Sequence, residues 1–294
     1  MTINKSFYGL NKDMTSKEVA EKILNSLMDN VKKETAAVID GKNYENLHNF
    51  RVAVRRIKTL LKIFRQQLSR RGIYFKKKLT KIMKETQRKR DLDVLIESMD
   101  LYVKDEVPML LKEEIRLKIE KEIRVEQGKI LSVIGSQEFS GFLADFENAL
   151  KNGDLFDGKL NDVEPLEHLV LTIKKTYKKL AVIIKTTSLD DEELHILRLM
   201  FKEFRYILEF SYDLIKEDIM VQTISRLEKI QKILGDAQDK IVQINIYKKL
   251  IDKSKPIRNS IKKALNADRK KVIELIENFE EDKDIKSFIR MLNA

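Results

Sequence analysis

Apolar residues recur at helical spacing along almost the whole chain. Between residues 15 and 39, Val19, Ile23, Leu27 and Val31 follow one another at intervals of four, which places them on one face of a helix. The Asp-Gly pair that follows is a typical helix end. The same periodicity predicts further helices over residues 44–70, 73–99, 107–134, 137–150, 166–186, 190–216, 219–252, 256–279 and 283–292. The pattern therefore predicts an all-α fold.

Turn-forming residues are scarce and concentrated. The 294 residues include only 9 Gly and 3 Pro, too few for the tight turns of a sheet protein. Periodicity is lost over residues 151–165, a stretch rich in Gly, Asn and Asp that ends in a proline. We interpret this stretch as a linker between a first helical bundle, residues 15–150, and a second, residues 166–294, with residues 1–14 as an N-terminal extension. Each half is long enough for about four antiparallel helices.

A basic stripe occurs twice, at an offset of 147 residues. The segments LHNFRVAVRRIKTLLKIF, residues 47–64, and LHILRLMFKEFRYILEFS, residues 194–211, align without gaps. In this alignment His48, Arg51, Arg55 and Lys58 match His195, Arg198, Lys202 and Arg205. Their spacing keeps each set within about 80° around its helix, opposite an apolar face. A single basic stripe is typical of a solvated helix face, but the same His-led stripe occurring twice favours a binding surface.

A second repeated block follows each stripe. Residues 79–93 align with residues 227–241, and the alignment pairs Lys81 with Lys229, Lys84 with Lys232 and Asp91 with Asp239. The lysines can neutralise an anion. The aspartates either hold cationic side chains in fixed rotamers or form local ion pairs and caps. They are too isolated to indicate a metal site.

The charge balance agrees with an anionic partner. The chain carries 58 Lys and Arg against 47 Asp and Glu, a formal net charge of +11. It has no Cys, which excludes disulfides, thiolate metal sites and a Cys nucleophile. Its apolar runs are far shorter than the roughly 20 residues of a membrane span, and its N-terminus has no apolar signal core. We therefore expect a soluble, cytoplasmic protein.

Together, the two stripes and the blocks RKRDLDVLI and LEKIQKILGDAQDKIV resemble the four motif blocks of the CHAD domain, the conserved histidine α-helical domain. The resemblance extends from about residue 15 to about residue 292. It implies two pseudo-symmetric antiparallel bundles, each of about four helices, that face a central basic groove and bind inorganic polyphosphate without a cofactor. Gln87 stands where the second half has Gly235, so a tight bend is expected at Gly235 only.

The resemblance also assigns site residues. The expected polyphosphate contacts are His48, Arg51, Arg55, Arg56, Lys58, Lys62, Lys81, Lys84, Arg88, Arg90, His195, Arg198, Lys202, Arg205, Lys229 and Lys232, with Asp91, Asp93 and Asp239 behind them. Arg56 points about 80° away from its stripe, which makes it the weaker candidate. Association with polyphosphate granules is one option for localisation, while oligomeric state and chain-length preference stay open.

Two alternatives remain at this point. One is nucleic-acid binding, above all of RNA, although only Tyr206 lies near the stripes as an aromatic platform for bases. The other is a phosphoanhydride hydrolase with His48 and His195 as acid and base, although the sequence has no Gly-rich phosphate loop and no clustered carboxylates for Mg²⁺. We therefore expect a binding protein and not an enzyme. If the two histidines charge near pH 6.5, affinity rises as the pH falls from 8 to 6.

Overall fold

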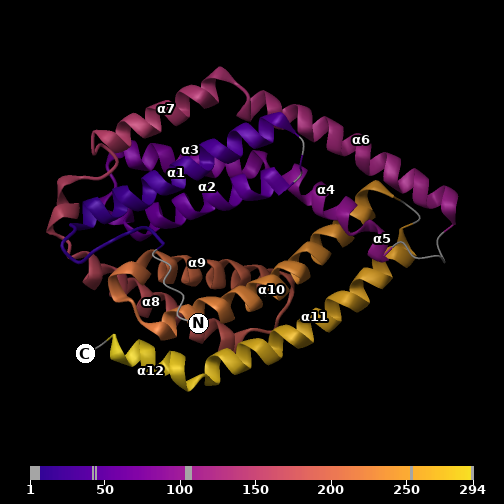
Figure 1. Cartoon of the computed structure of the whole chain (residues 1–294). Helices are drawn as coiled ribbons and strands as arrows, with labels where there is room; N and C mark the ends of the chain where they lie inside the picture. Colours follow the sequence, from indigo (N-terminus) through magenta and orange to yellow (C-terminus); the bar gives the residue numbers. More distant parts are fainter. Residues whose placement is uncertain (1–6, 42, 44, 103–107, 252–253, 293–294) are drawn as a thin grey trace.

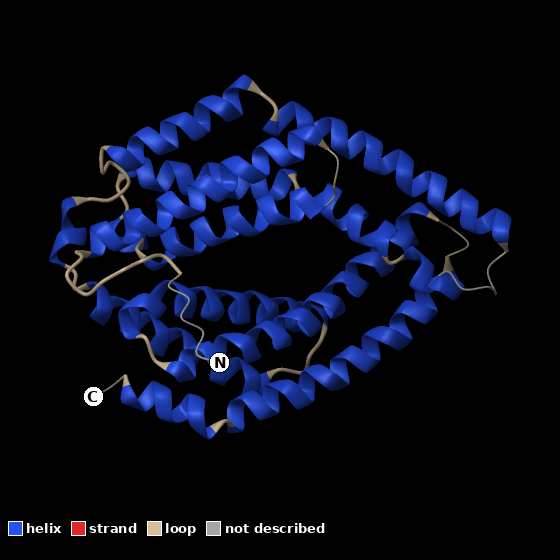
Figure 2. Cartoon of the chain, in the orientation of Figure 1, coloured by secondary structure: helices blue, strands red, loops and turns tan. Residues whose placement is uncertain are grey.

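The protein is built from helices. The computed structural model describes residues 7–41, 43, 45–102, 108–251 and 254–292, and the only β pairing among them is an isolated bridge between Leu68 and Phe156 (Figure 2). The α-helices are α1 Ser16–Asp40, α2 Glu45–Ile63, α3 Arg70–Glu85, α4 Gln87–Glu97, α5 Met99–Tyr102, α6 Met109–Ile134, α7 Gln137–Lys151, α8 Pro165–Thr186, α9 Asp191–Ile215, α10 Asp218–Leu250, α11 Lys255–Glu281 and α12 Lys283–Met291. Two short 3₁₀ helices, η1 Arg65–Gln67 and η2 Gly158–Asp162, lie between them. The predicted all-α class is confirmed.

The helices form two groups (Figure 1), which contact each other in more than one place, because apolar residues of α9 are buried in the core of the first group. Helices α1, α2, α3 and α7 surround one apolar core, which contains Phe50, Phe75 and Phe146. Helices α8 to α12 surround a second core around Phe201 and Phe204. A third core joins the groups, because apolar residues of α4, α5 and α6 pack there against α10 and α11. The two halves of the chain are therefore held together by buried apolar surface.

Two of the predicted helices are interrupted. The helix expected over residues 44–70 ends at Ile63, and Ser69 starts a new helix by accepting a hydrogen bond from the Gly72 amide at 3.1 Å. The helix expected over residues 73–99 breaks at Thr86, whose hydroxyl donates to the Ile82 carbonyl at 2.9 Å. The same hydroxyl bond occurs inside the unbroken helices α2 and α3, at Thr59 and Thr80, so it does not break a helix by itself. At Thr86 the Arg51 guanidinium also donates to the hydroxyl and to the Met83 carbonyl, and apolar periodicity does not reveal these bonds.

The bend expected at Gly235 is wrong. Helix α10 runs unbroken through Gly235, whereas the interruption lies in the first half, at Thr86. The position of Thr86 is taken in the second half by Leu234, which is fully buried in the core and offers no hydroxyl to an arginine as Thr86 does to Arg51. The broken pair α3 and α4 thus corresponds to one continuous helix, α10.

Residues 151–165 pack against the first half of the chain. Leu155, Phe156 and Leu160 are buried in its core, and the Leu155 carbonyl accepts from the Ser69 amide at 3.1 Å. A β-carbon at Gly72 would lie 2.2 Å from the Leu155 carbonyl oxygen, so only glycine allows this approach. The segment predicted as a linker therefore forms a packed corner beside the start of α3.

The described part of the N-terminal extension docks on α9. Asp213, which is buried, accepts backbone hydrogen bonds from Phe7 at 3.0 Å, Tyr8 at 2.7 Å and Leu10 at 3.2 Å. The extension thus crosses to a helix about 200 residues away in sequence. Among the described residues, no helix combines the length and the hydrophobicity needed to cross a bilayer.

Candidate anion-binding cavity

A cavity of about 360 Å³ lies between α2 and α4 of the first half and α9 and α10 of the second. Its lining consists of His48, Arg51, Val52, Arg55, Gln87, Arg90, Asp91, Val94, His195, Arg198, Lys202, Gln238, Asp239 and Val242. Some of the residues that the two sequence alignments pair, such as Arg51 with Arg198 and Asp91 with Asp239, therefore lie on the walls of the same cavity. We refer to this space as the central cavity.

Positive charge exceeds negative charge in the central cavity. Its walls carry five Arg and Lys side chains, Arg51, Arg55, Arg90, Arg198 and Lys202, against two carboxylates, Asp91 and Asp239. Arg90 is also held from outside the cavity by Glu45 at 3.6 Å and Glu97 at 3.8 Å. Within the described chain, Arg55 forms no ion pair. An anion that enters this space relieves repulsion among cations that the protein leaves uncompensated.

The pKa values reflect this excess. Burial, followed by the charges of Arg198 and Arg55, lowers the pKa of Lys202 to about 6. Burial, followed by the charge of Arg90, lowers the pKa of His48 to about 4. His48 is therefore neutral between pH 6 and 8, and the expectation that it charges near pH 6.5 is wrong because the cavity disfavours a further cation there.

Arg51 is held in place by hydrogen bonds. It is 4% exposed, and its guanidinium donates to the Met83 carbonyl at 2.7 Å, to the Thr86 hydroxyl and to the Gln87 side-chain carbonyl. Gln87 in turn donates to Asp91 at 2.6 Å. Burial lowers the pKa of Arg51 to about 10, so it stays charged at neutral pH. Arg51 both lines the cavity and fastens α2 to the junction of α3 and α4.

Arg198, the counterpart of Arg51, has a spare donor. Its Nε is buried without a hydrogen-bond partner, and it lies 3.9 Å from where a β-carbon on Gly235 would be. Gly235 occupies the position that Gln87 holds in the first half, so the amide that would satisfy the guanidinium is missing. A buried unsatisfied donor that borders a cavity favours a bound acceptor such as a phosphate oxygen.

Several expected site residues lie outside the central cavity. Arg56 donates to the Glu209 carboxylate and to the Tyr8 hydroxyl at 3.0 Å. Arg205 also pairs with Glu209, at 3.4 Å, and with Glu228, at 3.2 Å. Arg56 and Arg205 therefore belong to a partly buried network that joins α2, α9 and the N-terminal extension.

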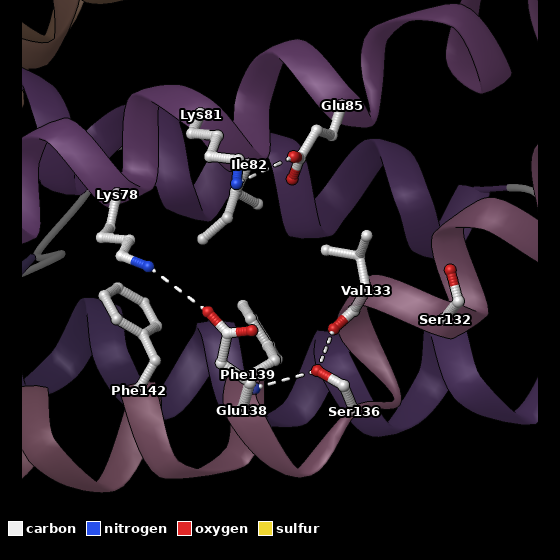
Figure 3. Close-up of a pocket in the computed structure, with 10 residues that line it drawn as sticks. All are labelled: Lys78, Lys81, Ile82, Glu85, Ser132, Val133, Ser136, Glu138, Phe139 and Phe142. Atoms are coloured by element: carbon white, nitrogen blue, oxygen red, sulfur yellow. Dashed lines mark hydrogen bonds and ion pairs between the residues drawn. The ribbon is translucent and has the colours of Figure 1, made fainter.

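Other expected contacts face different parts of the surface. Lys81 lies 3.6 Å from Glu85 beside a separate pocket between α3 and α7 (Figure 3). Arg88 lies 3.5 Å from Glu122. Lys229 lines a pocket with Phe279, and Lys232 is exposed on α10. The expected residues Lys58, Lys62 and Lys84 lie along α2 and α3, outside the cavity lining.

Asp93 serves a neighbouring site. It pairs with Lys89 one turn earlier, and both side chains are buried. These two residues line a pocket with Ile96 and Ile123, distinct from the central cavity. Helix α4 thus presents Asp91 to the central cavity and Asp93 to another.

Sequence reasoning missed the role of two amides. Gln87 and Gln238 both line the central cavity, and the Gln238 carbonyl oxygen lies 3.2 Å from His195 Nδ1. A signal existed for Gln238, because it aligns with Arg90 in the second repeated block. Amide side chains carry no charge, so a search for basic stripes does not detect them.

The CHAD domain family model matches residues 22–248. Among solved structures, the CHAD domain from the plant Ricinus communis superposes with a TM-score of 0.70 at 22% identity, covering 98% of this chain and 95% of that one. PptA from Streptomyces chartreusis superposes with a TM-score of 0.65 at 12% identity, covering 93% of this chain and 100% of that one. The comparison with curated proteins gave no match. At these identities the two structures show a shared fold.

Proposed function

This chain belongs to the CHAD domain family, and from that premise we propose that it binds inorganic polyphosphate in the central cavity. The observation that carries the proposal is the excess of basic over acidic side chains, five Arg and Lys against two Asp, in a cavity shared by both halves of the chain. The resemblance of the four motif blocks to a polyphosphate-binding family supports the same ligand.

The donor set suits phosphate groups. Arginine offers a planar fork of N–H donors to phosphate oxygens, and lysine offers a mobile point charge. Neutral His48 adds one N–H donor. The described lining includes no Phe, Tyr or Trp, the side chains that single-strand binders mainly use as platforms to stack bases. These features favour a ligand made only of phosphates over a nucleic acid.

We propose binding without hydrolysis. Incubation of the protein with polyphosphate and Mg²⁺ or Mn²⁺ tests this part directly, and no release of inorganic phosphate is the expected result. Continued release of more than one phosphate per protein molecule, which Arg55→Ala abolishes, would overturn it.

The proposal also includes a cytoplasmic location in which the protein associates with polyphosphate granules. Fluorescence microscopy of the tagged chain beside a polyphosphate stain tests this location.

Arg55 is the residue on which to test binding. It lines the cavity and forms no ion pair in the described part of the chain. Its removal therefore relieves repulsion among the cations and leaves no carboxylate without its counter-charge. Arg51 is unsuitable because its hydrogen bonds support the fold. The matched control is Arg124→Ala, which removes the same charge from the outer helix α6, where the side chain is 69% exposed.

The measurement is a titration with long-chain polyphosphate at about 50 and 200 mM salt, beside single-stranded RNA and duplex DNA. We expect Arg55→Ala to weaken polyphosphate binding about tenfold and Arg124→Ala to leave it unchanged. Polyphosphate should stay bound at the higher salt while the nucleic acids dissociate. Equal weakening of all three ligands, or equal affinity of Arg55→Ala and wild type, would overturn the proposal.

A further inference from the structure

Cationic side chains continue from the central cavity along the adjacent helices α2 and α3. These residues, which we call the α2–α3 ribbon, are Lys58, Lys62, Arg65, Lys76 and Lys84. Arg55, on the cavity wall, precedes Lys58 by one turn of α2. From Arg51 to Lys62 the helix rises about 16 Å, so the ribbon extends well beyond the cavity.

The packing of α2 on α3 builds the ribbon. The two helices are antiparallel neighbours (Figure 1), and the hydrogen bond from Arg51 to the Met83 carbonyl sets their register. Moving seven residues forward on α2 and seven backward on α3 brings Lys58 opposite Lys76. Lys76 and Lys84 lie on one row of α3, two turns apart. The cations of α2 therefore lie beside those of α3.

Within the described chain, an acidic residue neutralises one member of the ribbon, Lys62, and the other four have no ion pair. In the described structure Lys58, Arg65, Lys76 and Lys84 form no ion pair, and Lys62 pairs with Glu203 at 2.6 Å. Burial, followed by the charges of Arg55 and Lys76, lowers the pKa of Lys58. Burial, followed by the charges of Arg65 and Lys62, lowers the pKa of Lys76. The cations are therefore close enough to repel one another, from the cavity wall to the end of α2.

The described second half of the chain lacks most of this path. Arg205, which aligns with Lys58, is paired with Glu209 and Glu228. Glu209 itself stands at the position of Lys62, and Ile224, a buried apolar residue, stands at that of Lys76. Among the described counterparts of the ribbon, Lys232, which aligns with Lys84, is the one basic residue without an ion pair. The two halves thus share the cavity, and the continuous row of cations that leads away from it lies in the first half.

We propose that the α2–α3 ribbon binds the continuation of a polyphosphate chain whose inner part occupies the central cavity, so that the first half of this protein selects long chains over short ones. The inference rests on the proposed function. A polyphosphate chain is a flexible rod with about one negative charge per phosphate. Rows of lysine can neutralise these charges, and groups that recognise bases are not needed. Tripolyphosphate is short enough to use the cavity alone and gains nothing from the ribbon.

The test compares long-chain polyphosphate with tripolyphosphate on the full chain. The variant is Lys58→Ala/Lys76→Ala, and the control is Lys262→Ala/Lys263→Ala, which removes two charges from the exposed face of α11. We expect the ribbon variant to lose about tenfold in affinity for the long chain and less than about twofold for tripolyphosphate. The slope of log affinity against log salt should fall by about two, one for each lost contact. The control should match wild type with both ligands.

The outcomes separate the two proposals. If the ribbon variant binds long chains as wild type does while Arg55→Ala loses both ligands, the ribbon is wrong and the cavity stands. If wild type binds neither ligand, the proposed function fails and the ribbon fails with it. If single-stranded RNA loses affinity in the same proportion as polyphosphate, the ribbon is a generic polyanion surface. Because removing like charges relieves repulsion, the variant should melt at or above the wild-type temperature, and Lys58→Gln/Lys76→Gln repeats the test if it does not.

Discussion

Gly235 lies beside the guanidinium of Arg198, so close that a β-carbon on Gly235 would contact Arg198 Nε at 3.9 Å. In the first half of the chain the corresponding pair is Gln87 and Arg51, and there the glutamine accepts a hydrogen bond from the arginine. One wall of the cavity is therefore satisfied internally, and the opposite wall keeps an unpartnered donor. Because of this asymmetry, we expect a bound phosphate to accept a hydrogen bond from the Nε–H of Arg198.

Replacing Gly235 separates helix stability from binding. Glycine inside a helix costs about 1 kcal/mol relative to alanine, and 3.9 Å is ordinary van der Waals distance, so Gly235→Ala should raise the free energy of unfolding by about 0.5–1 kcal/mol. Gly235→Gln should supply the missing acceptor to Arg198 and fill part of the cavity, which lowers polyphosphate affinity about tenfold. Urea denaturation and titration measure the two effects. Equal affinities of the Ala and Gln variants would contradict this account of Arg198.

Arg51→Ala should destabilise the fold. The substitution leaves the Met83 carbonyl, the Thr86 hydroxyl and the Gln87 amide without their shared donor in a buried site, and we expect a loss of about 2–4 kcal/mol in the free energy of unfolding. Arg55→Ala is the matched control on the same helix and should change it by less than about 0.5 kcal/mol. Equal stabilities of the two variants, measured by urea denaturation, would show that Arg51 does not fasten α2 to α3.

Local patterns predicted the helices and much of the cavity wall. Apolar periodicity places one face of each helix in a core, and what remains on α2 and α9 is the pair of basic stripes, whose residues Arg51, Arg55, Arg198 and Lys202 line the central cavity. The angular position of Arg56 on its helix set it apart from that stripe, and in the structure it turns to Glu209. Such features follow from the helical repeat alone.

Long-range hydrogen bonds could not be predicted in this way. The break at Thr86 depends on a hydroxyl and on a donor from Arg51, 35 residues away. The capture of the N-terminal extension by Asp213 joins positions 203 to 206 residues apart. Neither interaction produces a periodic signal in the sequence. In each case a single polar side chain is involved, and its partner comes near it only in the folded protein.

Asp213→Ala should release the N-terminal extension. The buried carboxylate holds the amides of Phe7, Tyr8 and Leu10, and hydrogen bonds to a charged group contribute about 1.5–3 kcal/mol, so we expect a loss of about that size in the free energy of unfolding. Cleavage by trypsin after Lys12 should become faster. Asp29→Ala, at an exposed position on α1, is the control and should change neither quantity. Unaltered cleavage in Asp213→Ala would mean that other contacts hold the extension.

We expect Lys202 to couple polyphosphate binding to proton uptake. Its pKa of about 6 results from burial and then from the charges of Arg198 and Arg55, which outweigh the opposing charge of Asp239. Near pH 7.5 most molecules therefore hold Lys202 as the neutral amine. Phosphate oxygens favour the ammonium form and raise this pKa on binding, so a proton is taken up. Affinity should rise as the pH falls from 8 to 6 and level off below about 6, where the free protein is already protonated.

Isothermal titration calorimetry in buffers of different ionisation enthalpy measures that proton. At pH 7.5 wild type should take up about one more proton than Lys202→Arg, whose guanidinium keeps its charge across the range. Protons that bind to the polyphosphate itself are common to both proteins and cancel in the difference. Lys263→Arg, exposed on α11, is the control and should take up as many protons as wild type. If Lys202→Arg keeps the wild-type proton uptake and the wild-type pH profile, Lys202 is already charged in the empty cavity, and the excess of positive charge there is larger than its lowered pKa implies.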